Sequence, residues 1–409
     1  MRIAITSNGP GEFSGWVRPL VSALYRIAPA TDVTLFFVPD DYATGREPEV
    51  AQRMFPRAHV VAPNVYLRFA VGGRVAGVPE RVDVVQYLGG DLMHAARVHA
   101  RLGGSNRSYK FARKNLRDKL DRVYAVDTKN ADELIGLGFA AERVPIVGNL
   151  AVDGALGEAA GLFTQSAREA PIEPDGILVM PGTRRHEIAN ALPFFVQMAV
   201  RLREQRPDLR VAFAVSPFTS DHELARALER GGHRNVWGAR GRVVPLGPGV
   251  GLAPLAGGAP FPVVRDAMRH APDARLVVTL PGTKCIELAA LGVPAIVCTP
   301  LNAPEVVVIN GPLQYLDRLP FAGTFLKRAM VVVVDSRFPY TAQPNMDAGE
   351  ELMPELRGTL MPAAVARRVA AYADDAAARA AASVRLRELY AGHAGAAERM
   401  ARSLLEPSA

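Results

Sequence analysis

Short apolar runs alternate with helical or polar segments along the first third of the chain. The runs are rich in Val, Ile, Leu and aromatic residues and cover residues 2–6, 32–39, 59–62, 82–88, 122–126 and 145–147. A helical pattern over residues 16–27 follows the first run after a Gly-rich loop. This alternation is typical of a parallel sheet covered by helices on both faces. We therefore expect one doubly wound domain over residues 1–155.

The same alternation starts again after a small, polar stretch at residues 154–175. The later apolar runs cover residues 177–180, 210–215, 243–246, 275–279, 295–298 and 330–334, with helical segments such as 187–203 and 284–291 between them. The many Gly and Pro residues of 247–262 predict a loop. These patterns predict a second domain over residues 156–361. The Ala- and Arg-rich remainder, 362–409, predicts one or two long helices that could pack back on the first domain.

Two such domains predict an α/β fold in which two Rossmann-like sheets face a central cleft, with long C-terminal helices. Ligands of open parallel sheets bind outside the carboxyl ends of the strands. We therefore examined the residues that directly follow the predicted strands.

Charge and composition narrow the class of protein. The 48 Lys and Arg residues exceed the 41 Asp and Glu residues by seven among 409, so the surface should attract anions such as a nucleotide, a lipid headgroup or a nucleic acid. No nucleic-acid-binding motif accompanies this charge, so nucleic acid is not expected. The two cysteines, Cys285 and Cys298, lie in apolar stretches and predict reduced core thiols. With no signal peptide or membrane span in the sequence, we expect a cytoplasmic protein.

A basic segment at residues 107–119 keeps membrane contact open. Lys110, Arg113, Lys114 and Arg117 stand at helical spacings of three and four. A helix with this face could rest on the anionic inner face of the cytoplasmic membrane. A solvated helix face explains the same spacing.

Two strand, Gly turn, helix motifs in the second domain suit a phosphate. In the first, Gly182 and Thr183 open a long helix, and Arg184 could neutralise a diphosphate held there. The alternative is a solvated first turn.

In the second motif, Gly282 and Thr283 open a helix on which Glu287 stands four residues after Thr283. The two side chains share a face, so one could touch phosphate while the other accepts hydrogen bonds from ribose hydroxyls. The alternative is a threonine N-cap with a solvent-facing glutamate.

The first domain offers a turn and a carboxylate. A Gly-rich turn at residues 8–15 lies between the first strand and its helix, where glycines allow close approach of a ligand. An ordinary tight turn is the alternative.

Asp91 follows the run at 82–88, where a general base would face the cleft. An Asp that only caps the following helix is equally compatible with the sequence.

Taken together, these motifs resemble the lipid-A-disaccharide synthases, which are inverting glycosyltransferases of the GT-B fold. The matching residues are Gly11, Glu12, Phe13, Ser14 and Gly15; Gly148, Asn149, Leu150 and Asp153; Pro181, Gly182, Thr183, Arg184 and Glu187; Gly282, Thr283 and Glu287; and Pro344 and Asn345. Their order and spacing extend over nearly the whole chain.

The resemblance implies a hexosyltransferase that moves a glucosamine-type sugar from a UDP-sugar to a lipid or sugar-phosphate acceptor. Asp91 would be the catalytic base. The donor would be held by Gly182, Thr183, Arg184, Gly282, Thr283, Glu287 and Asn345, and the acceptor loop would contain Gly11, Glu12, Ser14 and Gly15. No metal and no other cofactor is expected, because helix ends and arginine would carry the diphosphate charge.

The first domain departs from the pattern of this family. Trp16 stands in place of an acidic residue, and the family's aromatic strand has no clear equivalent near residues 105–111. Two other functions therefore stay open: a UDP-sugar 2-epimerase of the same fold, and a non-catalytic nucleotide-sugar-binding protein.

Overall fold

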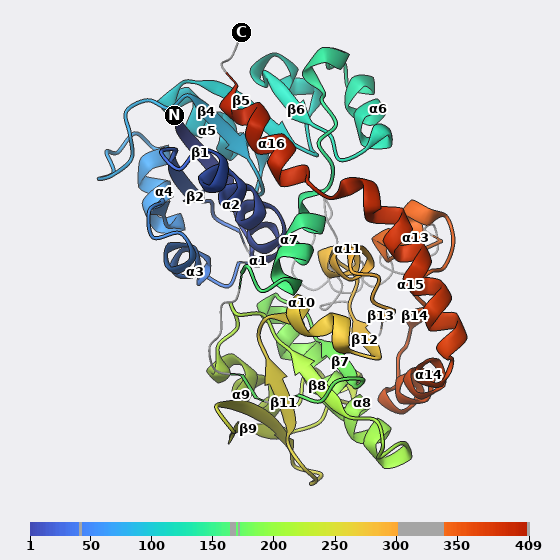
Figure 1. Ribbon diagram of the computed structural model, residues 1–409. Helices are drawn as coiled ribbons and strands as arrows, with labels where there is room; N and C mark the ends of the chain where they lie inside the picture. The colour runs from blue at the N-terminus through green and yellow to red at the C-terminus, as the bar shows by residue number, and fades with distance from the viewer. Residues whose placement is uncertain (41–42, 164–168, 171, 302–338, 407–409) are drawn as a thin grey trace, which may run out of the picture. The chain divides into compact units, whose positions relative to one another are not determined.

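The chain divides into two compact units, each with its own parallel sheet. The computed structural model describes residues 1–40, 43–163, 169–170, 172–301 and 339–406. Unit 1 contains residues 1–157 and 391–409, and unit 2 contains residues 158–390 (Figure 1).

The sheet of unit 1 has six strands, all parallel. They are β1 (Arg2–Ser7), β2 (Asp32–Phe37), β3 (His59–Val61), β4 (Val84–Tyr87), β5 (Ser105–Tyr109) and β6 (Arg122–Tyr124). Their order is β3-β2-β1-β4-β5-β6, and Ile3 of β1 is in register with Val33 of β2 and Val84 of β4. The chain runs outward from β1 to β3 and then crosses to the other side of β1 to form β4. The reversal of strand order therefore falls between β1 and β4.

Helices cover both faces of this sheet. They are α1 (Pro10–Glu12), the π-helical turn η1 (Phe13–Val17), α2 (Arg18–Ile27), α3 (Glu47–Met54), α4 (Pro63–Ala70), α5 (Leu92–Leu102), α6 (Thr128–Gly136), α7 (Leu150–Ala159) and α16 (Ala396–Leu405), with short 3-10 turns η2 (Lys114–Lys119), η3 (Ala141–Arg143) and η8 (Ala391–His393). One core lies between the sheet and α4 and α5, where Val85 and Phe36 meet Tyr66 and Val98. On the opposite face, α16 packs against α2.

The C-terminal helix α16 is fixed to unit 1 by side chains from distant parts of the sequence. Both oxygens of Asp153 on α7 accept hydrogen bonds at its N-terminus, from the Gly395 N–H at 2.7 Å and the Ala397 N–H at 2.6 Å. Near its other end, the Ser403 carbonyl accepts a hydrogen bond from the buried Arg107 guanidinium at 2.8 Å. These contacts satisfy backbone groups that a helix end leaves unpaired.

Within the described residues, the sheet of unit 2 has eight strands. They are β7 (Ile177–Met180), β8 (Val211–Ala214), β9 (Gly241–Leu246), β10 (Gly249–Pro254), β11 (Phe261–Val264), β12 (Leu276–Thr279), β13 (Ala295–Pro300) and β14 (Glu355–Gly358). Their order is β14-β13-β12-β7-β8-β11-β10-β9, and β10 runs antiparallel to both of its neighbours, β9 and β11, whereas the other described pairs are parallel. Strand order reverses here between β7 and β12.

Two groups of helices pack on this sheet. They are α8 (Arg185–Gln205), α9 (Asp221–Arg230), α10 (Ala267–His270), α11 (Thr283–Ala290), α13 (Gln343–Ala348), α14 (Pro362–Asp374) and α15 (Ala376–Tyr390), with 3-10 turns η4 (Arg234–Val236) and η5 (Ala271–Asp273). The helices α14 and α9 contact α8, and α15 contacts α11. The large core includes Phe195 on α8, Phe213 on β8 and Val369 on α14. The predicted α/β fold with parallel sheets and long C-terminal helices is confirmed.

Several local predictions differ from the structure. The segment at 247–262, predicted as a loop, forms β10 and the start of β11, because β10 pairs with β9 as a hairpin. The expected strand at 145–147 is reduced to a single bridge between Ala125 and Ile146. The predicted strand at 330–334 lies outside the described residues.

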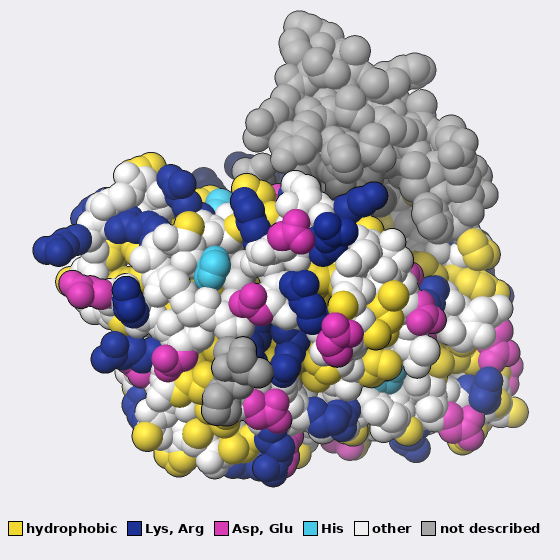
Figure 2. All heavy atoms as spheres, turned by 90° about the horizontal axis from the view of Figure 1, so that it is seen from above, with side chains coloured by type: hydrophobic (Ala, Val, Ile, Leu, Met, Phe, Trp, Pro, Cys, Tyr) yellow, Lys and Arg dark blue, Asp and Glu magenta, His cyan; other side chains and the backbone are white. Residues whose placement is uncertain are grey.

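The basic segment at 107–119 is not the predicted α-helix. Its first part continues β5, where the Arg107 side chain is buried, and only residues 114–119 form a 3-10 turn. The sheet is the stronger constraint because β5 pairs on both sides, with β4 and β6. On the face shown in Figure 2, Lys and Arg side chains are interspersed with Asp and Glu. Among the described helices, none is both long enough and apolar enough to span a membrane.

Replacing Asp153 should loosen α16 from unit 1. Asp153→Ala removes both acceptors at the helix start and should lower the free energy of unfolding by about 1–2 kcal/mol. Asp153→Asn keeps one acceptor oxygen and should cost less. The measurement is urea unfolding, with Asp132→Ala on the exposed side of α6 as the matched control. Equal midpoints for Asp153→Ala and the control would contradict the role of Asp153.

Candidate functional site

In unit 2, the two predicted phosphate turns lie next to each other at the reversal of strand order. The turn at 181–184 follows β7 and the turn at 280–284 follows β12, and Met180 is in register with Thr279. Each turn leads into a helix, α8 or α11, whose N-terminus carries a partial positive charge. The carboxyl edge at a reversal of strand order is where open sheets of this type bind ligands.

The N-terminus of α8 is already occupied by a carboxylate. Glu187 folds back so that its Oε2 accepts hydrogen bonds from the N–H of Thr183 at 2.8 Å and of Arg184 at 3.0 Å. The Arg184 guanidinium also donates to its Oε1 at 3.3 Å. Gly182 makes room for this carboxylate, since a Cβ there would lie 2.4 Å from Oε2. The Thr183 N–H, predicted to hold a diphosphate, is thus used within the turn.

The N-terminus of α11 is more open. In the described part of the chain, neither the N–H nor the hydroxyl of Thr283 has a hydrogen-bond partner. A Cβ on Gly282 would meet no atom within 4 Å. Lys284 places its ammonium 2.6 Å from Oε2 of the buried Glu287. This turn therefore combines a half-open helix start, a cation and a carboxylate.

Asn345 is held inside unit 2. Its Oδ1 accepts from the N–H of Leu352 and of Met353, both at 2.9 Å, and its Nδ2 donates to the Met353 carbonyl at 2.7 Å. Its Nδ2 also donates to Glu355, whose carboxylate caps the start of α13. Asn345 is fully buried, so its direct effect is to fix the loop between α13 and β14. Its predicted contact with a donor sugar stays a prediction.

In unit 1, the reversal of strand order brings together the turns after β1 and β4. Gly89 and Gly90 both have positive φ values, 138° and 83°. A Cβ on Gly89 would lie 2.4 Å from Oδ1 of Asn8, and 3.0 Å from Cγ of Glu12. The turn after β4 can therefore lie this close to the turn after β1 only because residue 89 is a glycine. The Oδ1 atom of Asn8 is buried without a hydrogen-bond partner among the described residues, an uncommon state for a polar atom.

Asp91 follows these glycines and caps α5. Its Oδ1 accepts from the Met93 N–H and its Oδ2 from the Arg113 guanidinium, both at 2.8 Å. Partial burial would raise the pKa of Asp91, but these two contacts outweigh it and hold the pKa below its usual value. The predicted base is therefore an ionised carboxylate at the carboxyl edge, and the carboxylate remains 43% exposed. The helix cap is therefore observed, and the role of Asp91 as a base stays a prediction.

A second titratable pair lies one turn further along α5. The His94 Nδ1 and the Tyr66 hydroxyl are 2.8 Å apart. Burial lowers the pKa of His94, although the nearby Asp91 charge opposes this shift. Burial also raises the pKa of Tyr66 to about 12. His94 is thus held largely neutral at pH 7 beside the carboxylate.

The predicted acceptor loop spans α1 and η1. Gly11 and Glu12 lie in α1, with Glu12 against Gly89, whereas Ser14 and Gly15 are buried in η1. A Cβ on Gly154 of α7 would lie 3.1 Å from the Ser14 carbonyl, so close packing of η1 on α7 explains this part of the motif.

The sequence analysis assigned no ligand-site role to two charged residues, Lys284 in unit 2 and Arg113 in unit 1. Lys284 stands inside the recognised Gly-Thr turn, and its position directly at a helix start was a readable signal. Arg113 is 22 residues from Asp91 in the chain, and its pairing depends on the sheet, so no local pattern could reveal it.

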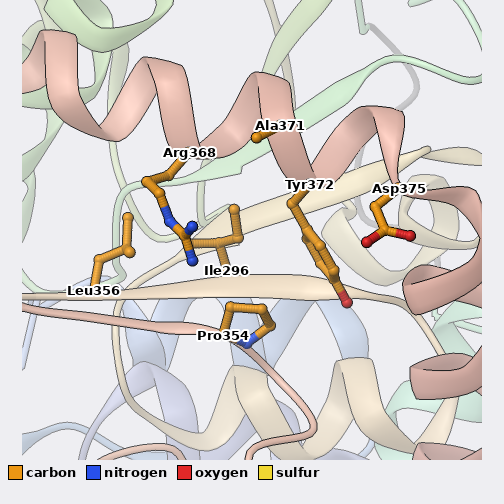
Figure 3. Close-up of a pocket in the computed structure, with 7 residues that line it drawn as sticks. All are labelled: Ile296, Pro354, Leu356, Arg368, Ala371, Tyr372 and Asp375. Atoms are coloured by element: carbon orange, nitrogen blue, oxygen red, sulfur yellow. The ribbon is translucent and has the colours of Figure 1, made fainter.

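A small hollow in unit 2 lies away from this edge. It has a volume of about 190 Å³ and lies between α14 and the first residues of β13 and β14. Figure 3 shows Arg368 and Tyr372 reaching down from α14 toward Ile296 and Pro354. Burial raises the pKa of Tyr372 to about 12. The hollow is smaller than ligand pockets usually are, so we interpret it as a gap in helix-on-sheet packing.

No protein-family model matches the chain, and no curated protein matches it. Solved structures with the same fold do. A protein assigned as a UDP-N-acetylglucosamine 2-epimerase from Listeria monocytogenes is 13% identical, with 100% of this chain and 97% of that chain covered and a TM-score of 0.59. The UDP-GlcNAc 2-epimerase from Neisseria meningitidis, bound to UDP-GlcNAc, is 10% identical, with 99% and 100% covered and a TM-score of 0.55. The S. aureus protein MnaA, bound to UDP, is 13% identical, with 98% and 95% covered and a TM-score of 0.55.

These similarities establish the GT-B-like fold and correct the function expected from the sequence. The resemblance to lipid-A-disaccharide synthases is wrong, as are the hexosyltransferase activity and the role in lipid A biosynthesis that it implied, because the matching structures named here include two of UDP-GlcNAc 2-epimerases. The physical reason is that the matched motifs are strand, Gly turn, helix junctions. Such junctions form wherever parallel strands lead into helices, so they identify the fold and not the reaction.

Removing Arg113 should raise the pKa of Asp91. Arg113→Gln deletes a charge and a strong hydrogen bond, whereas the partial burial that raises the pKa remains. The measurement is the pH titration of the Asp91 carboxyl carbon by NMR. Arg117→Gln, which removes a cation paired with Asp118, is the control. An unchanged Asp91 pKa in Arg113→Gln would show that the pair has no electrostatic effect.

Proposed function

We propose that the protein is an enzyme that binds a UDP-sugar and inverts the configuration at C2 of its sugar. The observation that carries this proposal is the fold, which matches UDP-GlcNAc 2-epimerases over essentially the whole length of both chains. Two of the matching structures contain UDP-GlcNAc or UDP. A lipid or sugar-phosphate acceptor and a membrane surface have no part in this reaction. A cytoplasmic location stays a prediction.

For the diphosphate, the turn at the start of α11 is the better candidate of the two predicted turns. The Thr283 N–H and hydroxyl can donate to phosphate oxygens, and the Lys284 ammonium adds a charge-assisted contact. At α8 the corresponding N–H groups donate to Glu187. Gly182, Thr183 and Arg184 would then shape the edge without binding phosphate directly. We further propose Glu287 as the ribose contact, reached when Lys284 turns from it to the phosphate.

The proposed chemistry requires a base. Inversion at C2 breaks a C–H bond and restores it on the opposite face of the sugar. The electron pair left at C2 can form a C1–C2 double bond if the C1–O bond breaks, and the diphosphate then leaves with the electron pair of that C1–O bond. Return of the diphosphate to C1 and of a proton to the other face of C2 completes the exchange. An ionised carboxylate at a ligand edge suits proton removal, which supports Asp91 as the base.

The direct test is incubation with UDP-GlcNAc alone in D2O. The account predicts that a second UDP-N-acetylhexosamine forms and that deuterium enters C2, because the removed proton exchanges with solvent. Proton NMR detects both. Asp91→Asn should lower turnover by about 10²–10⁴-fold while UDP affinity is kept. UDP binding without turnover or deuterium exchange in the parent protein would favour the non-catalytic binding protein.

Variants at the two turns separate the candidate phosphate sites. Lys284→Gln should weaken UDP binding by about tenfold or more, since charge-assisted hydrogen bonds contribute about 1.5–3 kcal/mol. Lys284→Arg keeps a cation beside Glu287 and should recover part of the affinity. Calorimetry measures both, and Arg226→Gln on the exposed face of α9 is the control. A larger loss from Arg184→Gln than from Lys284→Gln would move the diphosphate to α8.

A further inference from the structure

Two aromatic side chains form a partly exposed surface at the carboxyl edge of the unit 1 sheet. The Trp16 ring lies 6.2 Å from the Phe111 ring and 5.5 Å from the Tyr109 ring, measured between centroids. Tyr109 is buried and anchored, because its hydroxyl donates to the Gly148 carbonyl and accepts from the Leu150 N–H. Phe111, in contrast, is 46% exposed. We call Trp16 and Phe111 the aromatic shelf.

The backbone under the shelf is held in uncommon conformations. Trp16 lies in the π-helical turn η1, and such turns are frequent at functional sites. Lys110, directly before Phe111, has a φ of 64°, which is unfavourable for a side chain of its size. Hydrogen bonds keep it there: the Lys110 N–H donates to the Tyr124 carbonyl at 2.8 Å, and the Asn130 amide donates to the Lys110 carbonyl at 3.1 Å. The sequence thus maintains a strained turn that presents an apolar ring to solvent.

One residue of the shelf lies close along the chain to the partner of the predicted base. Phe111 is two residues from Arg113, whose guanidinium is 2.8 Å from Asp91. The Lys110 ammonium lies 5.5 Å from the centre of the Phe111 ring. Phe111 follows β5 and Trp16 follows β1, and Asp91 follows β4, the strand between them. Flat apolar rings, two cations and a hydrogen-bond-accepting carboxylate therefore lie along one edge of the same sheet.

We infer that the aromatic shelf is a sugar subsite, which binds the hexosamine ring of the nucleotide sugar through the C–H face of that ring. A pyranose has an apolar face that packs on aromatic rings and hydroxyl donors that suit the Asp91 carboxylate. Lys110 and Arg113 carry N–H donors that suit the hydroxyl oxygens of the sugar. The inference rests on the proposed function for the identity of the ligand. It assigns Trp16 and Phe111 to specificity for the sugar ring.

The two tryptophans of the chain allow the subsite to be tested by fluorescence. Trp16 lies in unit 1, and Trp237, 44% exposed, lies in unit 2. Trp237→Phe makes Trp16 the sole reporter, and Trp16→Phe does the same for Trp237. In Trp237→Phe, UDP-GlcNAc should change the emission of Trp16 and protect it from acrylamide quenching, whereas UDP should do neither. Calorimetry on the same samples measures binding independently.

Affinity measurements give a second readout. Phe111→Ala should weaken UDP-GlcNAc binding by about three- to tenfold and leave UDP binding unchanged, in line with the energy of aromatic contacts. Phe111→Tyr should behave as the parent. Leu67→Ala, at an equally exposed apolar side chain on α4, is the control and should change neither affinity.

The outcomes separate the subsite from the proposed function. UDP-GlcNAc that binds by calorimetry without affecting Trp16, or an equal loss of UDP and UDP-GlcNAc affinity in Phe111→Ala, would overturn the sugar subsite and leave the epimerase proposal standing. A response of Trp16 to UDP alone would assign the shelf to the nucleobase and also overturn it. Trp16 protection without epimer formation would support the subsite and reject the reaction. If neither ligand binds, both proposals are wrong.

Discussion

Parallel pairing at two points of strand-order reversal is the constraint on which the rest of the structure depends. In unit 1 the first strand, β1, lies between β2 and β4, and in unit 2 β7 lies between β8 and β12. At each point the chain leaves the two central strands in opposite directions, so the loops that follow them diverge. The residues that could bind or react with a ligand collect there because of this topology: Asn8 and Asp91 in one unit, Thr283 and Lys284 in the other.

Glutamate side chains make the helix starts of unit 2 differ from one another. The Glu187 carboxylate accepts hydrogen bonds from the N–H groups of the two residues directly before α8, and Glu355 does the same before α13. Glu287 instead pairs with Lys284, and the Thr283 N–H is left outside that contact. Since a helix N-terminus attracts one anion at a time, an internal carboxylate competes with a phosphate for the same groups. Two turns with almost the same sequence pattern can therefore differ in what they bind.

The sequence predicted the two-domain α/β fold because periodicity and Gly-containing turns are local signals. It also located the turns at 182–184 and 282–283, Asp91, and the start of α11 at Thr283. It failed where tertiary pairing overrides local pattern: the polar segment from Ser105 to Tyr109 is a buried central strand, and the Gly-rich segment after β9 completes a hairpin. For residues 107–119, the spacing of the basic side chains alone had suggested a helix. The Arg113 contact with Asp91 and the Trp16 contact with Phe111 join distant positions, so no single-sequence pattern contains them.

The central claim is that the protein binds a UDP-sugar, with the diphosphate at the start of α11 in unit 2. A crystal structure of the protein with UDP-GlcNAc tests it most directly. The account predicts phosphate oxygens within hydrogen-bond distance of the Thr283 N–H and the Lys284 ammonium, with the Glu187 carboxylate still bound at the start of α8. A diphosphate that displaces Glu187 at α8, or a nucleotide bound away from both turns, would contradict it.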